Sequence, residues 1–327
     1  MTPDTAIRQM LREHLPKDFG KRDPRRLGWL LLALLFVSAH LLVVRAALKG
    51  DAYGWWMIAT LPAAVTTWPY FLFVLHELGH GALLPRGPVR FLASAFAAYP
   101  ILLQPTFWSV VHNHHHKYVN QEEDHDRRRI AGRGEVGERL YEYELDNPWI
   151  IFSLVCAIHA VYYGQLWAFL TEKISFNVTR GRVLIELAGG LLFAVGLAWF
   201  LGWRMLIVGW LPYALVGSTL QSLYLISNHL TRPMVAHADS LNAGVSVELL
   251  HGWSHMDFGR HVEHHLFPYV PGNQLKSVTI LLRRIYPDRF REGTLIGIVQ
   301  QLLKLPGYYL TYDVLTDRTG TKRVRID

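Results

Sequence analysis

Long apolar runs separated by short polar breaks dominate the chain. Four runs of roughly 20 residues, at 27–48, 53–75, 183–201 and 205–226, carry few charged side chains. A helix rises about 1.5 Å per residue, so a run of this length can cross the hydrocarbon core of a membrane. The pattern predicts four transmembrane helices. Because the breaks within each pair are very short, we expect two helical hairpins.

Two further apolar stretches, 91–111 and 148–170, lie between the second and third runs. Polar or helix-breaking residues interrupt both stretches, namely Pro100, Gln104 and Pro105 in the first, and His159, Gly164 and Gln165 in the second. Such stretches are typical of interfacial or re-entrant helices. Near the C-terminus, residues 294–305 have amphipathic helical spacing and predict a further helix.

The distribution of basic residues orients these helices. Seven of them precede the first apolar run, namely Arg8, Arg12, Lys17, Lys21, Arg22, Arg25 and Arg26. The positive-inside rule therefore predicts a cytoplasmic N-terminus, 1–26, and places 86–182 and 229–327 together in a cytoplasmic cap. The first run begins too late and is too long for a cleaved signal peptide, so it predicts a retained anchor.

The expected architecture is thus an all-α, multi-pass membrane protein with one membrane-embedded domain over 1–327. Both termini are expected in the cytoplasm, and the inner membrane is the expected location if the chain is bacterial. With 51% hydrophobic residues, the composition is typical of such a protein. We expect contact with membrane lipids and no nucleic-acid partner. The single cysteine, Cys156, excludes an intrachain disulfide and a cysteine-ligated cluster.

Histidine clusters supply the candidate chemistry. HELGH, HNHHH and HVEHH contain eight regularly spaced histidines, namely His76 and His80, then His112, His115 and His116, and finally His261, His264 and His265. Residues three or four apart share one face of a helix, so each cluster can present imidazoles together. A zinc site closes at about four ligands. Eight imidazoles therefore predict a site for two metal ions.

The predicted topology brings these clusters together, because each lies at the cytoplasmic end of a helix. His229 follows the fourth apolar run directly and is a candidate ninth ligand. Four further residues are candidates for orienting ligand imidazoles through hydrogen bonds, namely Glu77, Asp124, His125 and Glu263.

Three other chemistries share part of this pattern. HELGH satisfies the H-E-x-x-H motif of zinc proteases and resembles the intramembrane protease site, but the nearest candidate for its distant aspartate, LDNP, lacks the glycine. That interpretation also leaves six clustered histidines unexplained. A ferritin-like di-iron bundle would use E-x-x-H pairs, which occur at 122–125 and 248–251, but the first lies in a charged segment. A metal transporter would need more ionisable residues within its spans than His40, Arg45 and Glu186.

HELGHG, HNHHH and HVEHHLFPYVP resemble the three histidine boxes of the membrane fatty acid desaturase superfamily, over roughly 74–282. The resemblance implies a non-haem di-iron enzyme that uses dioxygen to introduce a double bond into a fatty acyl chain. The eight clustered histidines match the family's iron ligands position by position. His229 resembles an additional ligand found in some members.

The resemblance leaves the outcome of the reaction and the reductant open. Hydroxylases of acyl, alkane or other lipid substrates use the same boxes, although the third box with its LFP tail favours a desaturase. The acyl group could be linked to a lipid, coenzyme A or a carrier protein. The sequence has no haem, flavin or dinucleotide motif of its own, so we expect a separate electron donor such as a ferredoxin or cytochrome. Two arginine-rich segments are candidates for steering an acidic donor, namely Arg127, Arg128, Arg129 and Arg133, or Arg283, Arg284 and Arg289.

Overall fold

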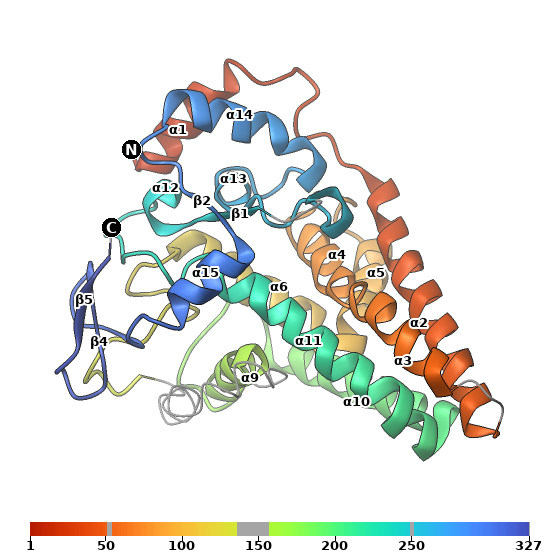
Figure 1. The fold of residues 1–327 in the computed structure, drawn as a ribbon. Coiled ribbons are helices and arrows are strands. Elements are labelled where there is room, and N and C mark those ends of the chain that lie inside the picture. The colour runs from red at the N-terminus through yellow and green to blue at the C-terminus, as the bar shows by residue number, and fades with distance from the viewer. Residues whose placement is uncertain (51–53, 136–156, 249–251, 327) are drawn as a thin grey trace.

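A computed structural model of the chain describes residues 1–50, 54–135, 157–248 and 252–326. Most of these residues are helical. Figure 1 shows the long helices gathered at one end of the molecule, with short helices and two small sheets at the other.

Three stretches of the described residues are long and apolar enough to cross a membrane. Helix α2 (Gly28–Leu48) lies in the first stretch, Pro24–Leu48. The second stretch, Gly54–His80, contains α3 (Gly54–Val65) and α4 (Pro69–His80). The third, Arg180–Ile226, contains α10 (Arg180–Met205), the π-helix Leu206–Trp210 and α11 (Leu211–Ile226). The predicted membrane character is confirmed, whereas the two-hairpin arrangement remains a prediction.

The second stretch differs from its expected bounds at both its middle and its end. The Thr67 hydroxyl donates to the Ala64 carbonyl, and Pro69 starts a new helix, so the backbone turns between α3 and α4. Helix α4 then runs five residues beyond the predicted end at Leu75. It ends at Gly81, whose φ of 76° is left-handed and favours glycine. The whole HELGH motif consequently lies on α4.

A backbone break divides the third stretch. Gly202 has φ 73° and ψ 158°, outside the helical region, at the point where the sequence predicts a turn. The part of α10 before Gly202 exposes large apolar side chains such as Leu192, Trp199 and Phe200. An apolar surface of this kind is typical of a helix that faces lipid.

The predicted interfacial stretches are short helices. Residues 91–111 fall on α5 (Pro88–Ala98) and α6 (Pro105–Tyr118), separated by a turn in which Leu102 has φ 58°. The described part of the second stretch is α9 (Ala157–Leu170), and residues 148–156 lie outside the described residues. Phe169 of α9 packs on Phe107 of α6, with ring centroids 5.2 Å apart.

The cap contains strands, so the all-α prediction was incomplete. Strands β1 (Ser246–Glu248) and β2 (Glu292–Thr294) pair in parallel. A second, antiparallel sheet consists of β3 (Tyr308–Tyr309), β4 (Val314–Thr316) and β5 (Arg323–Arg325). None exceeds three residues, which is too short for a recognisable alternating pattern. The amphipathic helix expected at 294–305 is present as α15 (Leu295–Leu302).

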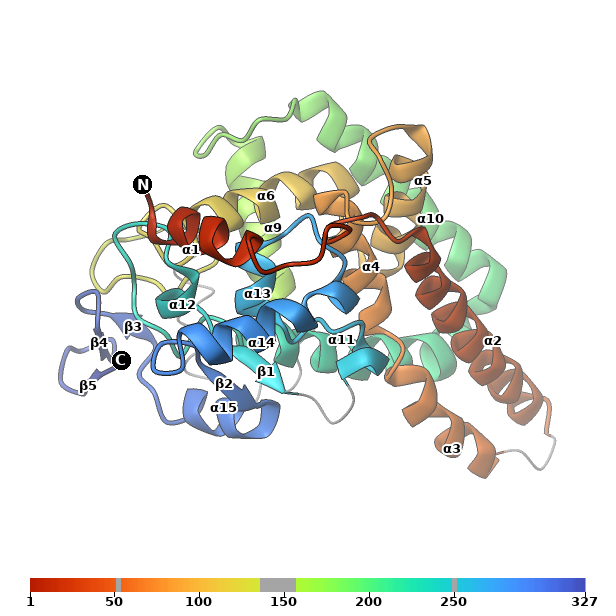
Figure 2. The same ribbon diagram turned by 90° about the horizontal axis from the view of Figure 1, so that it is seen from above.

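The N-terminal segment is folded onto the cap. Figure 2 shows α13 (His261–Leu266) between α1 (Pro3–Arg12) and α14 (Lys276–Ile285). Ile7 and Leu11 share an apolar cluster with Val262 and Leu266 of α13. The Asp4 carboxylate accepts hydrogen bonds from the backbone and side chain of Ser240, in the short helix α12 (Ser240–Ala243), which contacts α13. The helix that carries the third histidine cluster is therefore enclosed on two sides.

Candidate metal centre

The nine predicted histidines converge from four parts of the fold. His76 and His80 occupy the last turns of α4, and His229 lies three positions after the end of α11. The other six lie on two helices, with His112, His115 and His116 on α6 and His261, His264 and His265 on α13. Segments separated by as many as 189 positions, from 76 to 265, thus meet in one place.

The nine imidazoles form two groups. The first, called here the five-histidine group, consists of His76, His80, His112, His116 and His264. The second, the four-histidine group, consists of His115, His229, His261 and His265. Within each group, one ring nitrogen of every member lies within 4.8 Å of the others. Each group is therefore able to hold a metal ion.

The groups do not coincide with the motifs in the sequence. On α6, His112 and His116 join the five-histidine group while His115 joins the other. Successive residues are about 100° apart around a helix, so position i+4 lies about 40° from position i, whereas position i+3 lies about 60° from it in the opposite direction. On α13 the assignment is reversed, since His264 alone joins the five-histidine group. Each of these helices contributes to both groups.

The four-histidine group is crowded around one ring nitrogen. His229 Nε2 lies 2.6 Å from His261 Nε2, 3.1 Å from His265 Nε2 and 3.2 Å from His115 Nε2. A neutral imidazole nitrogen has either one hydrogen or one lone pair, so three simultaneous hydrogen bonds between these rings are not possible. Four converging lone pairs around a cation satisfy the same geometry.

Hydrogen bonds on the far side of two rings orient them. The Nδ1 of His229 lies 2.8 Å from the carbonyl oxygen of Ala243, and the Nδ1 of His115 lies 3.0 Å from an Asp124 oxygen. A carbonyl or carboxylate accepts the Nδ1 hydrogen, which leaves the Nε2 lone pair directed into the group. This is the arrangement of metal-binding histidines.

The five-histidine group contains buried nitrogens that need a partner. His116 Nε2 is 3.0 Å from both His112 Nε2 and His264 Nε2. The Nε2 atoms of His76 and His80 are buried, and no residue in the described ranges forms a hydrogen bond with them. A buried polar atom without a partner costs about 1–3 kcal/mol. A metal ion at this position would satisfy both atoms.

The surroundings keep most of these imidazoles neutral. Burial, followed by the proximity of other histidines, lowers the pKa of His112, His116 and His264 well below the usual value. Burial also lowers the pKa of His229 to about 3. His115 differs: burial opposes its protonation, but the Asp124 charge and hydrogen bond outweigh this effect and raise the pKa. A neutral ring offers the lone pair that a metal requires.

The profile of the fatty acid desaturase family matches residues 53–292. This segment covers most of the chain and contains all nine histidines. The chain belongs to the fatty acid desaturase family. It is also similar to the sn-1 oleoyl-lipid 12-desaturase of Picosynechococcus sp., with 23% identity over 336 residues, 91% of this chain and 90% of the relative. Membership makes the protein an oxidoreductase of desaturase type.

An apolar cavity joins both histidine groups of this desaturase-family protein. Its volume is about 210 Å³. Four of the histidines line it, namely His112 of the five-histidine group and His115, His229 and His261 of the other. Much of the remaining wall is apolar and comes from α4, α6, α9 and α11, with Leu72, Val111, Val161 and Leu225 among the lining residues, and Phe258 adds to it from the segment before α13. The cavity has the chemistry required for an acyl chain.

The four residues predicted to orient ligands lie in different surroundings. Asp124 accepts a hydrogen bond from His115, as described above. His125 stacks on His114, with ring centroids 5.2 Å apart, away from both groups. The Glu77 carboxylate accepts hydrogen bonds from Arg26 and from the Gly272 backbone. Because both of its oxygens are engaged, Glu77 is not positioned to activate a metal-bound water as in a zinc protease.

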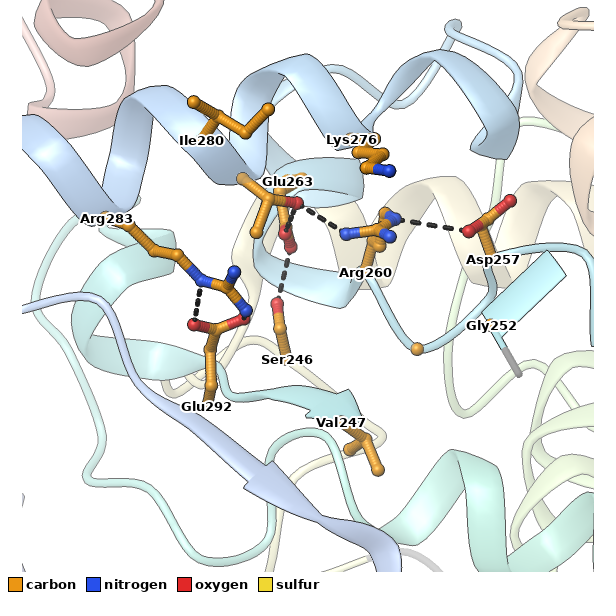
Figure 3. A pocket seen from close by; sticks show the side chains of 12 residues that line it. Ser246, Val247, Gly252, Asp257, Arg260, Glu263, Lys276, Ile280, Arg283 and Glu292 are labelled. Atoms are coloured by element: carbon orange, nitrogen blue, oxygen red, sulfur yellow. Dashed lines mark hydrogen bonds and ion pairs between the residues drawn. The ribbon is translucent and has the colours of Figure 1, made fainter. Parts of the chain in front are cut away.

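Glu263 lies on the opposite side of α13 from the histidines, next to a surface pocket of about 330 Å³ (Figure 3). Its buried carboxylate accepts hydrogen bonds from the hydroxyls of Ser246 and Thr279. Arg260 donates in turn to Thr279 and to Asp257. These bonds hold the turn of α13 that supplies ligands to both groups.

In one of the two expected docking segments, three of the four arginines are not at the surface, while Arg133 is about half exposed and pairs with Glu122. The side chains of Arg127, Arg128 and Arg129 are buried, and they donate to backbone carbonyls, including those of Gln121 and Leu230. Their positive charges therefore support the fold and do not form an exposed surface for a partner. On α14, by contrast, Arg283 and Arg284 are exposed.

The sequence patterns did not reveal Arg26, Ser246 or Thr279. Arg26 is 51 positions from Glu77, and its place among the basic residues before the first apolar run offers an ordinary explanation for its charge. Ser246 and Thr279 are single hydroxyl residues without a motif. The only sequence signal for Arg26 would have been its position directly before the apolar run at 27–48, where a charged side chain needs a pairing partner.

Proposed function

We propose that this protein is a membrane-bound di-iron desaturase that introduces a double bond into a fatty acyl chain. The observation that carries the proposal is the apolar cavity whose wall includes members of both histidine groups. In this proposal His76, His80, His112, His116 and His264 bind one iron, and His115, His229, His261 and His265 bind the other.

The choice of iron rests on the ligand sets and on the family. Imidazole also suits zinc, copper and nickel, so ligand type alone does not select the metal. A group of five histidines exceeds the four ligands at which structural zinc sites close, and desaturation requires a redox-active metal. When bound, the two irons would supply the activation of dioxygen that desaturation requires.

The reaction needs an external reductant. Removal of two hydrogens from adjacent methylenes provides two electrons, while reduction of one O2 to two water molecules takes four electrons and four protons. The remaining two electrons and two protons must therefore come from outside the acyl chain and O2. Since the chain has a single cysteine and no recognised haem, flavin or dinucleotide motif, we propose a separate donor such as a ferredoxin or cytochrome. Exposed Arg283 and Arg284 on α14 are candidates for contact with it.

The protein's own residues provide position and a dry environment. The apolar wall holds methylenes beside the histidine groups and excludes water from them. Asp124 and the Ala243 carbonyl fix the rings of His115 and His229. Because the similar Picosynechococcus protein is an oleoyl-lipid desaturase, we favour an acyl chain linked to a membrane lipid over one linked to coenzyme A or a carrier protein.

For the membrane arrangement we propose two helical hairpins. Residues 27–48 and 53–75 would form the first, and 183–201 and 205–226 the second, with Gly202 in the turn. Both termini and the cap would then lie in the cytoplasm, at the inner membrane if the protein is bacterial. The excess of Lys and Arg in the cap supports this orientation.

The test is lipid analysis of a host that expresses the wild-type protein, the His264→Ala variant or the His237→Ala variant. His237 is exposed and belongs to neither group, so it is the matched control. We expect a new unsaturated acyl chain with the wild type and the control, and none with His264→Ala. A hydroxylated product would instead identify a hydroxylase. Purified wild-type protein with one zinc and no iron would refute the proposal.

A further inference from the structure

A buried ion pair joins the first apolar helix to the HELGH motif. Arg26 lies in a short 3-10 helix at the start of the first span, and Glu77 lies on α4. Arg26 Nε and Nη2 each donate to a different Glu77 oxygen at 2.8 Å, which is the bidentate geometry of strong arginine–carboxylate pairs. Both side chains are about 8% exposed.

The same pair also holds the segments on either side of α13. Arg26 Nη2 donates to the Met256 carbonyl at 2.7 Å, before α13, and the Gly272 backbone nitrogen donates to Glu77 at 2.8 Å, after it. The approach is close enough that a Cβ on Gly272 would lie 2.4 Å from the Met256 oxygen. Arg26 and Glu77 thus connect α4 to both flanks of α13.

This connection concerns one histidine group more than the other. Glu77 lies between His76 and His80 on α4, and both histidines belong to the five-histidine group. Their partner His264 comes from α13. No member of the four-histidine group lies on α4. A displacement of α4, with α13 kept in place by its apolar contacts with α1 and α14, would therefore alter the five-histidine group and leave the other intact.

The pair is not well explained by stability alone. Removing two charges from water costs several kcal/mol per ion, and a buried pair can often be replaced by apolar residues without loss of stability. What an apolar replacement cannot supply is the directional contact with two backbone groups at fixed positions. The geometry is consequently the contribution that is specific to these two residues.

We propose that Arg26 is a positioning residue, which holds α4 against α13 and so shapes the five-histidine group for its metal ion. This inference rests on the proposed function, in which each group binds one iron. Arg26 acts through Glu77 and the α13 flanks, and it does not touch the metal. Its loss is expected to weaken metal binding at the five-histidine group alone.

The experiment compares four variants of the full-length protein with the wild type. Arg26→Met breaks the pair, and Arg26→Met/Glu77→Met replaces it without leaving an unpaired buried charge. Arg26→Lys keeps the charge but loses the bidentate contact. Arg25→Met is the matched control, because the Arg25 side chain is 88% exposed and pairs with Asp23. Each purified protein is loaded with 57Fe(II), equilibrated with a graded iron chelator, and measured for iron per chain and by Mössbauer spectroscopy.

We expect two iron environments in the wild type and in Arg25→Met. The double variant is expected to lose one environment selectively, with an affinity about 10–100-fold lower at that site, as for other residues that orient ligands. Arg26→Lys should fall between these results. A double variant that retains both environments at wild-type affinity would overturn the proposal, as would equal weakening of both sites. A wild-type protein that binds no iron would instead overturn the proposed function.

Discussion

Replacement of Asp124 by Asn is expected to weaken the four-histidine group selectively. The Asp124 carboxylate is 1% exposed and accepts hydrogen bonds from three donors. His115 Nδ1 lies 3.0 Å from one oxygen, the Asn120 backbone nitrogen donates to that oxygen at 2.9 Å, and the Asp126 backbone nitrogen donates to the other at 2.9 Å. An asparagine in either orientation would place an NH2 group against one of these backbone N–H donors.

The magnitude follows from what is lost. A hydrogen bond to a charged group contributes about 1.5–3 kcal/mol, and removing a partner that orients a ligand lowers metal affinity roughly 10–100-fold, or about 1.4–2.7 kcal/mol. The two ranges agree. His115 belongs to the four-histidine group only, so the effect is expected at that site and not at the five-histidine group.

The assay is chelator competition with Mössbauer detection on purified Asp124→Asn protein. Glu123→Gln is the control, because Glu123 is exposed and contacts His114 through its backbone carbonyl, which the substitution leaves in place. We expect loss of one iron environment at chelator concentrations that leave the control fully loaded. Retention of both irons at wild-type affinity would show that Asp124 does not orient His115, and prior loss of the other environment would show that the grouping is wrong.

Three further predictions concern the cavity, the packing and the pH dependence. Leu225→Trp should fill part of the acyl cavity and abolish product formation while both irons are retained, which lipid analysis and metal analysis together test. Gly217→Ala should lower the thermal unfolding temperature in detergent, because the added Cβ would lie 2.4 Å from Trp68. Gly196→Ala should raise it, because nothing lies within 4 Å of the added Cβ and alanine is favoured over glycine in a helix by about 1 kcal/mol. In metal-free protein, burial raises the pKa of Asp124, but the His115 charge and the hydrogen bonds from His115, Asp126 and Asn120 together lower it more. The folded-state pKa is thus below 3.8, the ordinary value for an aspartate. The full contribution of the Asp124 carboxylate to the stability of the folded protein is therefore present above pH 3.8. The free energy of unfolding, measured against pH, should be higher for the wild type than for Asp124→Asn, and this difference should disappear as the pH falls through the folded-state pKa of Asp124.

The parts of the fold that the sequence predicted are those specified by local pattern. Hydropathy located the first apolar helix to within one residue at its start, with the run at 27–48 found as Gly28–Leu48, because lipid requires a continuous apolar segment. The spacing of three and four residues identified the histidines that converge, since it follows from helical geometry. The strand Glu292–Thr294 was not predicted because its partner, Ser246–Glu248, lies 46 positions away.

The grouping of the histidines is a property of the packing between helices. Sequence spacing showed that His112, His115 and His116 occur on one helix, but not that His115 would join His229, His261 and His265. That assignment depends on the way in which α6 faces α13, and this is set by contacts distant in sequence. Arg26 is a clear example, because its partners Glu77 and Met256 are 51 and 230 positions away.

The sharing of α6 and α13 between the two groups has a mechanical consequence. Any shift of either helix changes both groups at once, so neither helix can adjust one site independently. The two groups differ only in the segments that complete them, which are α4 for one and His229, three positions after the end of α11, for the other. Independent adjustment must therefore come from α4 or from His229, or through hydrogen bonds to a single ring such as His115. Arg26 and Asp124 act at these points, which is why their variants are expected to separate two sites built on the same pair of helices.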